Sequence, residues 1–146
     1  MFKIQKINQK ATAPQRATDG SAGYDLCACL ENEITINSGE IVLIPTGLCI
    51  ELPKNTAGMI YARSGLATKH GIALANSVGV VDWDYRGEVK IALINLSKNT
   101  YKINNGDRIA QLVLTPVVCP NVIWADNLNE TERGAGGFGS TGINKN

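Results

Sequence analysis

The stretch Gly79–Glu88 holds the densest group of side chains that could do chemistry, among them Asp82, Asp84, Tyr85 and Arg86. Side chains alternate along a β-strand, so in a strand Asp82 and Asp84 would lie on one face. Two neighbouring carboxylates can hold a metal ion or act as a general base. The alternative is a polar hairpin tip, in which the two aspartates cap N–H groups of the turn. The spacing alone leaves both interpretations open.

Asp25 is a third acidic candidate, because a charged residue in an otherwise apolar strand needs a partner. Four of the five arginines lie in compact motifs beside glycine, serine or aspartate, namely Ala62–Gly65, Asp84–Gly87, Gly106–Arg108 and Glu132–Gly134. Arginine suits fixed, bidentate contacts with phosphate or carboxylate groups. For Arg86 and Arg108 we favour pairs with the nearby acidic residues. Arg63 lacks an acidic neighbour and opens a candidate helix, whose free N–H groups would face an anion.

The segment Glu132–Gly142 differs in kind from the rest, since five of the chain's fifteen glycines lie in it. It has too few side chains to form a core, and one interpretation is a flexible terminus. The other is a backbone that wraps around an anion, with Arg133 as a bidentate donor. A plain linker does not normally carry an arginine and a lone phenylalanine, Phe138.

Composition narrows the class of protein. The chain has 146 residues, of which 44% are apolar and 18% charged, and this predicts one globular domain. The formal net charge of +1 gives no general attraction to nucleic acid or to an anionic membrane. No apolar run approaches the roughly 20 residues of a membrane span, and the polar start of the chain does not resemble a signal peptide. We therefore expect a cytoplasmic protein with no nucleic-acid or membrane partner.

Cysteine and histidine offer little chemistry. The four cysteines, Cys27, Cys29, Cys49 and Cys119, form no C-x-x-C pair, and we expect reduced, buried thiols. The single histidine, His70, excludes a His-rich zinc site. It lies in a polar run, so we expect it on the surface rather than beside a nucleophile.

Short β-branched runs between turn residues dominate the chain and predict an all-β sandwich, jelly roll or barrel. The expected strands are Phe2–Ile7, Tyr24–Ala28, Glu33–Ile36, Glu40–Ile44, Gly47–Leu52, Gly58–Ala62, Ile72–Ala75, Glu88–Leu96, Thr100–Ile103 and Arg108–Val118. The one helix candidate is the short segment Ser64–His70.

Taken together, the motifs resemble those of a known family. The five segments that carry the resemblance are, in order, Ala22–Leu26, Ala62–Ala67, Gly79–Gly87, Gly106–Leu112 and Arg133–Gly142. They are similar to the five motifs of the trimeric dUTPase family, and the resemblance extends over nearly the whole chain, from about Ala11 to Gly142.

The resemblance implies a fold, a reaction and an assembly. The fold would be a distorted jelly-roll β-barrel over residues 1–132, with one short helix. The reaction would be hydrolysis of dUTP to dUMP and pyrophosphate with Mg²⁺, which keeps dUTP low and supplies dUMP for thymidylate synthesis. The assembly would be a homotrimer with shared active sites, in which the flexible glycine-rich arm, residues 133–146, closes over a neighbouring subunit's site.

The resemblance also implies roles for individual residues in the reaction. Asp82 would be the general base that activates water for attack on the α-phosphorus. Ser64 would donate to the bridging oxygen of the leaving pyrophosphate, and Gln111 would contact the α-phosphate or the water. Asp25 would hold Mg²⁺ through water, the ion itself being bound mainly by the triphosphate. The residues implied to bind substrate are Arg63, Ser64, Gly65, Asn76, Val80, Val81, Asp82, Tyr85, Lys90, Gln111, Arg133, Phe138 and Gly139.

Selection of the substrate would rest on a hairpin, Ala75–Asp82, that resembles the uracil pocket of the family. In it Asn76 and backbone groups would mimic base pairing, and cytosine would leave some of these groups unpaired. Tyr85 would lie against the deoxyribose and clash with a 2′-hydroxyl. Arg133 would grip the γ-phosphate, and Phe138 would stack over the uracil.

Two other functions stay open on the sequence. One is a dCTP deaminase-type enzyme, which shares this fold but needs residues that activate water at the cytosine ring. The other is a jelly-roll module that binds a nucleotide without turning it over.

Overall fold

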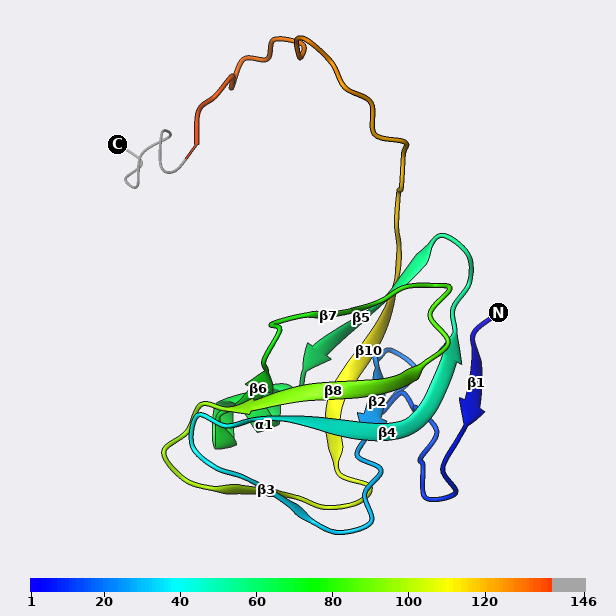
Figure 1. The fold of residues 1–146 in the computed structure, drawn as a ribbon, viewed down its shortest axis with the longest axis vertical. Coiled ribbons are helices and arrows are strands. Elements are labelled where there is room, and N and C mark those ends of the chain that lie inside the picture. Colours follow the sequence, from blue (N-terminus) through cyan, green and yellow to red (C-terminus); the bar gives the residue numbers. More distant parts are fainter. Residues whose placement is uncertain (138–146) are drawn as a thin grey trace.

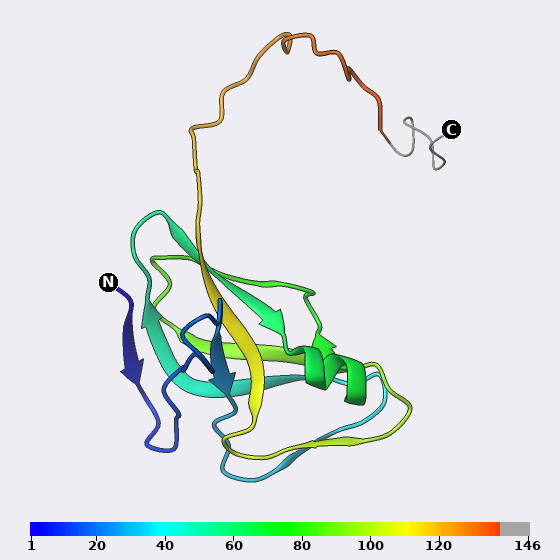
Figure 2. The same ribbon diagram turned by 180° about the vertical axis from the view of Figure 1, so that it is seen from behind.

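The computed structural model describes residues 1–137, and most of their regular structure is β-strand (Figure 1, Figure 2). The strands are β1 (Lys3–Lys6), β2 (Tyr24–Cys27), β3 (Ile34–Ile36), β4 (Ile41–Glu51), β5 (Thr56–Ala62), β6 (Ile72–Leu74), β7 (Gly79–Val81), β8 (Glu88–Asn95), β9 (Tyr101–Ile103) and β10 (Arg108–Pro116). They form two four-stranded sheets, β1-β4-β8-β6 and β2-β10-β5-β7, and a small β3-β9 pair. Every strand pair is antiparallel. The predicted all-β, jelly-roll-like fold is confirmed.

The hydrophobic core is built from side chains of both four-stranded sheets. Burial alternates along β8, where Val89, Ile91 and Leu93 are buried and the residues between them are more exposed. This period of two is what a strand with one face on the core requires. The same cluster contains Leu26 of β2 and Leu112 of β10, so it joins the two sheets.

Strand β4 runs without interruption through Pro45, where the sequence predicts two strands, Glu40–Ile44 and Gly47–Leu52. Its pairing with β8 shifts register beyond Pro45, which marks a β-bulge. Proline has no backbone N–H to donate to the neighbouring strand, and a bulge tolerates this missing donor. The buried hydroxyl of Thr46 donates to the carbonyl of Val89 across the two strands at 2.6 Å. The proline therefore lies inside one strand rather than between two.

The segment Ala75–Asp82 connects the two four-stranded sheets, so the expected hairpin is wrong. Strand β6, which precedes the segment, pairs with β8, whereas β7 pairs with β5 in the other sheet. Both strands have three residues. Strands this short do not reveal their partners in the sequence, because a hydrophobic alternation needs more positions to be distinctive.

The predicted helix is confirmed as α1 (Ser64–His70). Arg63 precedes it as the N-cap, without a side-chain capping bond, and Gly71 ends it in the left-handed conformation at φ 68°. His70 is exposed, as expected, with its ring 4.9 Å from that of Tyr101. No helix of the described part is both long and apolar enough to cross a membrane.

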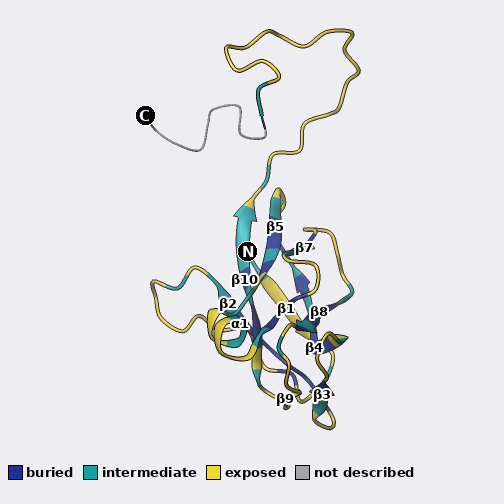
Figure 3. Cartoon of the chain, turned by 90° about the vertical axis from the view of Figure 1, so that its left-hand side faces the viewer, coloured by how far each residue is buried: buried dark blue, intermediate teal, exposed yellow. Residues whose placement is uncertain are grey.

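Beyond β10 the chain leaves the body as an extended segment (Figure 1, Figure 3). Residues 118–135 are exposed throughout. They include Trp124 and Val122, whose side chains are almost wholly in solvent, at 102% and 96% exposure. Large apolar side chains gain free energy when they leave water, so this segment is suited to cover another surface. The extended stretch begins well before residue 133, where the predicted arm starts, and that functional boundary stays a prediction.

All four cysteines are free thiols. Cys27 and Cys29 are buried as expected, and burial raises the pKa of both. Cys49 is only partly buried and Cys119 is exposed on the extended segment, so the expectation of four buried thiols is wrong for these two. A raised pKa keeps Cys27 and Cys29 protonated and unreactive at neutral pH.

The bulge of β4 predicts a stability effect at Gly47. This glycine has a φ of 68°, and an added Cβ would lie 2.8 Å from Cβ of Ala11 and from Sγ of Cys29. We expect Gly47→Ala to lower the free energy of unfolding by about 2–4 kcal/mol, through backbone strain and overpacking together. Urea denaturation measures this loss.

Gly39→Ala is the matched control for this variant. Gly39 has a φ of 76°, and nothing lies within 4 Å of an added Cβ. Only the strain of about 1 kcal/mol should remain there. Equal losses in the two variants would mean that the crowding around Gly47 does not matter.

Candidate functional site

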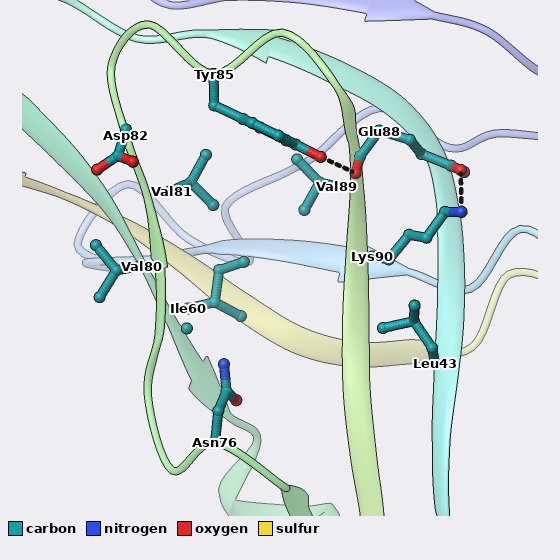
Figure 4. A pocket seen from close by; sticks show the side chains of 11 residues that line it. Leu43, Ile60, Asn76, Val80, Val81, Asp82, Tyr85, Glu88, Val89 and Lys90 are labelled. Atoms are coloured by element: carbon teal, nitrogen blue, oxygen red, sulfur yellow. Dashed lines mark hydrogen bonds and ion pairs between the residues drawn. The ribbon is translucent and has the colours of Figure 1, made fainter.

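A cavity with a volume of about 400 Å³ lies between β7 and β8 (Figure 4). Its lining residues are Leu43, Ile60, Asn76, Gly79, Val80, Val81, Asp82, Tyr85, Glu88, Val89 and Lys90. Aliphatic side chains form its floor, and polar groups stand around it. A cavity of this kind and size suits a small organic ligand such as a nucleoside.

One wall of the cavity is the backbone of β7. This strand lies at the end of its sheet, pairing on one side with β5, so its other edge offers backbone N–H and C=O groups to a ligand. Val81 is buried against the core, and Val80 is 61% exposed. Figure 4 shows Asn76 at one end of the cavity and Asp82 at the other. Hydrogen-bonding groups therefore occupy both ends of an apolar floor.

A tight turn carries Asp82. Strand β7 ends at Val81, and the N–H of Tyr85 donates to the carbonyl of Asp82 at 3.1 Å. Asp82 and Asp84 therefore lie in a turn and do not share a strand face, while the capping of turn N–H groups by their side chains and the role of a general base both stay predictions. Arg86 donates to the carbonyls of Trp83 and Tyr85, both at 2.9 Å. It stabilises the turn through the backbone, and the pair with an aspartate that we expected for it is wrong.

Tyr85 is fixed beside the cavity by its neighbours in sequence. Its hydroxyl donates to the carbonyl of Glu88 at 3.1 Å (Figure 4). The ring packs over Gly87, where an added Cβ would lie 2.6 Å from Cζ of the tyrosine. Only glycine leaves room for the ring in this position. Gly87 thus determines where the aromatic wall of the cavity stands.

Lys90 and Glu88 form a charged pair on the β8 side of the cavity. Nζ of Lys90 lies 3.5 Å from Oε2 of Glu88. The other oxygen of Glu88 accepts from the N–H of Gly47 at 2.9 Å, which ties the cavity to the bulge of β4. Glu88 therefore restrains the ammonium group of Lys90 at the cavity.

A second group of functional side chains surrounds Asp25 on β2. Its side chain is 11% exposed and accepts from two arginines. Nε of Arg63 lies 3.1 Å from Oδ1, and Nη1 of Arg108 lies 3.1 Å from Oδ2. The partner that Asp25 requires is thus confirmed. The nearby aspartate that we expected Arg108 to contact, Asp107, instead accepts from the N–H of Asn104 at 2.7 Å.

The cluster has a surplus of positive charge, since two guanidinium groups face one carboxylate. Asp25, Arg63 and Gln111 line a cavity of about 220 Å³. Gln111 of β10 is directly opposite Asp25 in the strand register. Ser64 and Gly65 follow Arg63 at the exposed start of α1. An anion such as a phosphate group fits this charge balance better than a bare cation.

A metal ion has no complete set of protein ligands here. Among residues 1–137, no three His, Cys, Asp or Glu side chains gather in a way that could hold one. Asp25 offers the carboxylate oxygens that Mg²⁺ prefers, and each oxygen has a second lone pair besides the one that an arginine occupies. The residues present therefore fit an ion that is held elsewhere and contacted through water.

The predicted site residues fall into separate groups within one chain. The two cavities share no lining residue. Arg133 lies on the extended segment, where its Nε donates to the carbonyl of Gly136 at 2.8 Å. Phe138 and Gly139 lie outside the described residues. Within the described part, one chain does not assemble the predicted site.

The structure adds three residues that the sequence analysis did not assign. Gly87 and Glu88 shape the cavity. Because side chains alternate between the two faces of a strand, the sequence of β8 could have placed Glu88 on the same face as Lys90. Arg108 contacts Asp25, which is 83 positions away, whereas the sequence suggested the adjacent Asp107 as its partner. No local pattern could have revealed it.

Comparison with known proteins gives a consistent result. Residues 9–142 match the family model for dUTPase. The chain is 56% identical over 131 residues to the deoxyuridine 5′-triphosphate nucleotidohydrolase of Desulfitobacterium hafniense, covering 89% of this chain and 87% of that one. It is 51% identical over 144 residues to the protein of the same name from Rickettsia felis, covering 97% and 96%.

Solved structures share the fold. A Staphylococcus bacteriophage 80alpha dUTPase with dUpNHpp superposes with a TM-score of 0.89 at 24% identity, covering 98% of this chain and 99% of that one. A mutant dUTPase from phage phi11 of S. aureus, described for its coordination of a structural Mg(II) ion, has a TM-score of 0.81 at 22% identity, covering 89% and 99%.

The charge balance around Asp25 predicts a stability effect. Asp25→Asn keeps the shape of the side chain but leaves two arginines without their counter-ion. Because the arginine side chains are 24% and 54% exposed, solvent reduces the penalty, and we expect a loss of about 1–3 kcal/mol in the free energy of unfolding. Chemical denaturation measures it.

Asp19→Asn removes the same charge from an exposed pair. Asp19 lies 3.9 Å from Arg16 and is fully in solvent. Its replacement should change stability by less than about 0.5 kcal/mol. If Asp25→Asn costs no more than this control, the two arginines do not depend on the carboxylate.

Proposed function

Because the chain belongs to the dUTPase family, we propose that it hydrolyses dUTP to dUMP and pyrophosphate through attack of water on the α-phosphate. The observation that carries the proposal is the position of Asp82 at one end of a nucleoside-sized cavity. An ionised carboxylate there can take a proton from water beside a bound nucleotide. The reaction lowers the dUTP concentration and supplies dUMP.

Asp82 is the general base of the proposal. It is exposed and lies in a turn rather than in the core, so water can reach its carboxylate. It needs only to orient a water molecule and accept its proton. Most of the acceleration then comes from positioning and charge neutralisation, as in other phosphoryl chemistry.

The cluster around Arg63 is the proposed phosphate site. Arg63, Ser64 and Gly65 bind the phosphate chain, and Gln111 contacts the α-phosphate or the water. The positive surplus of this cluster and its cavity support these roles. Ser64 donates to the bridging oxygen as pyrophosphate leaves.

The cavity beside β7 is the proposed uracil and deoxyribose site. Asn76 and the unpaired backbone edge at Val80 and Val81 supply hydrogen bonds to the base. Cytosine presents an amino donor where uracil presents its O4 acceptor, and an N3 acceptor where uracil presents an N–H donor, so some of these groups would stay unpaired against it. The fixed ring of Tyr85 excludes a ribose 2′-hydroxyl, and Lys90 contributes a charged contact at the cavity.

Mg²⁺ is the proposed cofactor. When bound, the ion neutralises part of the charge on the triphosphate. Asp25 holds it through water, in keeping with the reluctance of Mg²⁺ to lose its hydration shell. The carboxylate oxygens of Asp25 beside the phosphate cavity support this assignment.

A homotrimer with shared sites completes the proposal. The separation of the two cavities in one chain supports a site in which each group comes from a different copy. The apolar side chains of residues 118–128, which lie in solvent, support a segment that packs on a neighbour. Arg133, Phe138 and Gly139 would then close over that neighbour's nucleotide. We expect the trimer in the cytoplasm, without a nucleic-acid or membrane partner.

One assay separates this function from the two alternatives. Pyrophosphate release is measured with dUTP, dCTP and UTP, and ammonia release with dCTP. The proposal requires pyrophosphate from dUTP alone. Ammonia from dCTP would indicate a deaminase, and nucleotide binding without turnover would indicate a binding module.

Asp82→Asn should remove most of kcat while leaving the affinity for dUTP close to that of the parent. The amide keeps the shape of the side chain but cannot accept a proton, and loss of a general base typically costs 10²–10⁴-fold. Steady-state kinetics and binding of a non-hydrolysable dUTP analogue measure the two quantities. Glu33→Gln, which removes a negative charge from an exposed side chain that lines neither cavity, should keep parental kcat. Turnover by Asp82→Asn within a few-fold of the parent would exclude Asp82 as the base.

Mixing two inactive chains tests whether sites are shared. One chain carries Asp82→Asn, and the other ends before Arg133. If base and arm come from different subunits, random mixing in equal amounts gives about a quarter of the sites both intact parts. Activity should therefore return to about a quarter of the parental value after co-refolding. Mixed trimers that stay as inactive as their parents would contradict a shared site.

A further inference from the structure

Asp25, Arg63 and Arg108 form a closed ring of contacts at the ends of three adjacent strands. Asp25 accepts from Nε of Arg63 on one oxygen and from Nη1 of Arg108 on the other, each at 3.1 Å. The ring closes where Nη1 of Arg63 donates to the backbone carbonyl of Arg108 at 3.2 Å. Each of the three residues thus restrains the other two.

This ring leaves part of Arg63 free for a ligand. A guanidinium group has five N–H donors, and within the described residues Arg63 uses one on Asp25 and one on the carbonyl of Arg108. Three N–H groups remain for an anion. The contact between Arg63 and Asp25 is single, although the fork of an arginine favours two parallel bonds to a carboxylate.

Arg108 opposes the double contact by restraining the rotation of the carboxylate. Its Nη1 donates to Oδ2 of Asp25 at 3.1 Å and so holds on its own side the oxygen that a second bond from Arg63 would need. Without this guanidinium, the carboxylate could turn both oxygens toward Arg63. A bidentate pair would consume a further N–H of Arg63 and turn the group toward Asp25.

Arg108 does not itself line the proposed phosphate cavity. That cavity is lined by Arg63, Asp25 and Gln111 but not by Arg108, which lines two other cavities, one together with Asp25 and one together with Arg63. Its side chain is 54% exposed and contacts Asp25 within the protein. The residue therefore acts on the phosphate cavity through its neighbours.

We propose that Arg108 is a positioning residue, which occupies one oxygen of Asp25 and so keeps the guanidinium of Arg63 singly bonded and open toward phosphate. The inference rests on the proposed function, because it takes Arg63 to be a phosphate ligand. The side chain of Arg108 performs this task, and its backbone carbonyl, which every substitution preserves, holds the other edge of Arg63.

Replacement of Arg108 should impair phosphate recognition selectively. In Arg108→Gln we expect kcat/KM for dUTP to fall about 10–100-fold, mainly through KM, as for other residues that orient a ligand-binding group. Binding of deoxyuridine, which has no phosphate, should stay unchanged. Arg108→Lys should recover most of the loss, since the contact is a single hydrogen bond that an ammonium group can also make. Lys98→Gln, which removes a positive charge from an exposed side chain that lines none of these cavities, should match the parent.

A double-mutant cycle with Arg63→Gln decides whether Arg108 acts through Arg63. If it does, Arg108→Gln should have little further effect once Arg63 is gone. Independent, multiplicative effects of the two substitutions would overturn the inference. It would also be overturned if Arg108→Gln weakened the binding of deoxyuridine as much as it impaired the use of dUTP. Melting temperatures identify any variant that fails through unfolding. If Arg108→Gln unfolds, Arg108→Met, which keeps an apolar stem but has no donor for Asp25, supplies the Arg108 arm of the cycle.

Binding of inorganic triphosphate, measured by calorimetry on the same four chains, separates this inference from the proposed function. If the parent does not hydrolyse dUTP but the cycle on triphosphate is non-additive, the proposed function fails and the role of Arg108 stands. If the parent hydrolyses dUTP and the cycle is additive, the role of Arg108 fails and the function stands.

Discussion

A carboxylate buried in an apolar strand is the constraint from which much of this structure follows. Burial of this carboxylate costs less free energy when cations contact it, and the two that contact Asp25 come from positions 38 and 83 residues further along the chain. This requirement fixes the ends of β2, β5 and β10 relative to one another and sets the point at which α1 begins. It also leaves a surplus of positive charge beside Gln111, so the same contacts that hold the fold also prepare an anion site.

The cavity beside β7, at the opposite edge of the sheet from β2, is built by local contacts. The turn after β7, the glycine under the ring of Tyr85 and the alternation of β8 place the cavity wall through residues that are close in sequence. Selectivity built from the backbone in this way resists change, because no side chain can be added at Gly87 without moving the ring. The two candidate subsites thus differ in origin, one held by long-range ion pairs and the other by short-range geometry.

This difference explains which features could be predicted from the sequence. Helix α1 and most strands could be predicted, because capping glycines and hydrophobic alternation act locally. The residues expected around uracil, from Asn76 to Lys90, do lie around one cavity, because they are neighbours in the chain. The continuity of β4 through Pro45, the partner of β7 and the contact of Arg108 with Asp25 depend on distant strands, and no local pattern contains them. The chemical roles of these residues stay predictions.

The extended segment after β10 has an optical consequence. The chain contains two tryptophans, Trp83 on the turn beside the cavity and Trp124 on the segment that stands in solvent. Indole emission shifts to shorter wavelength when the ring leaves water, so the emission of Trp124 should report docking of the segment. Trp83 does not line the cavity, but it lies in the turn between two residues that do, Asp82 and Tyr85, so its emission should report changes in that turn. With the other tryptophan replaced by phenylalanine, each chain becomes a label-free reporter of a single event. The two events can then be timed separately in one stopped-flow instrument.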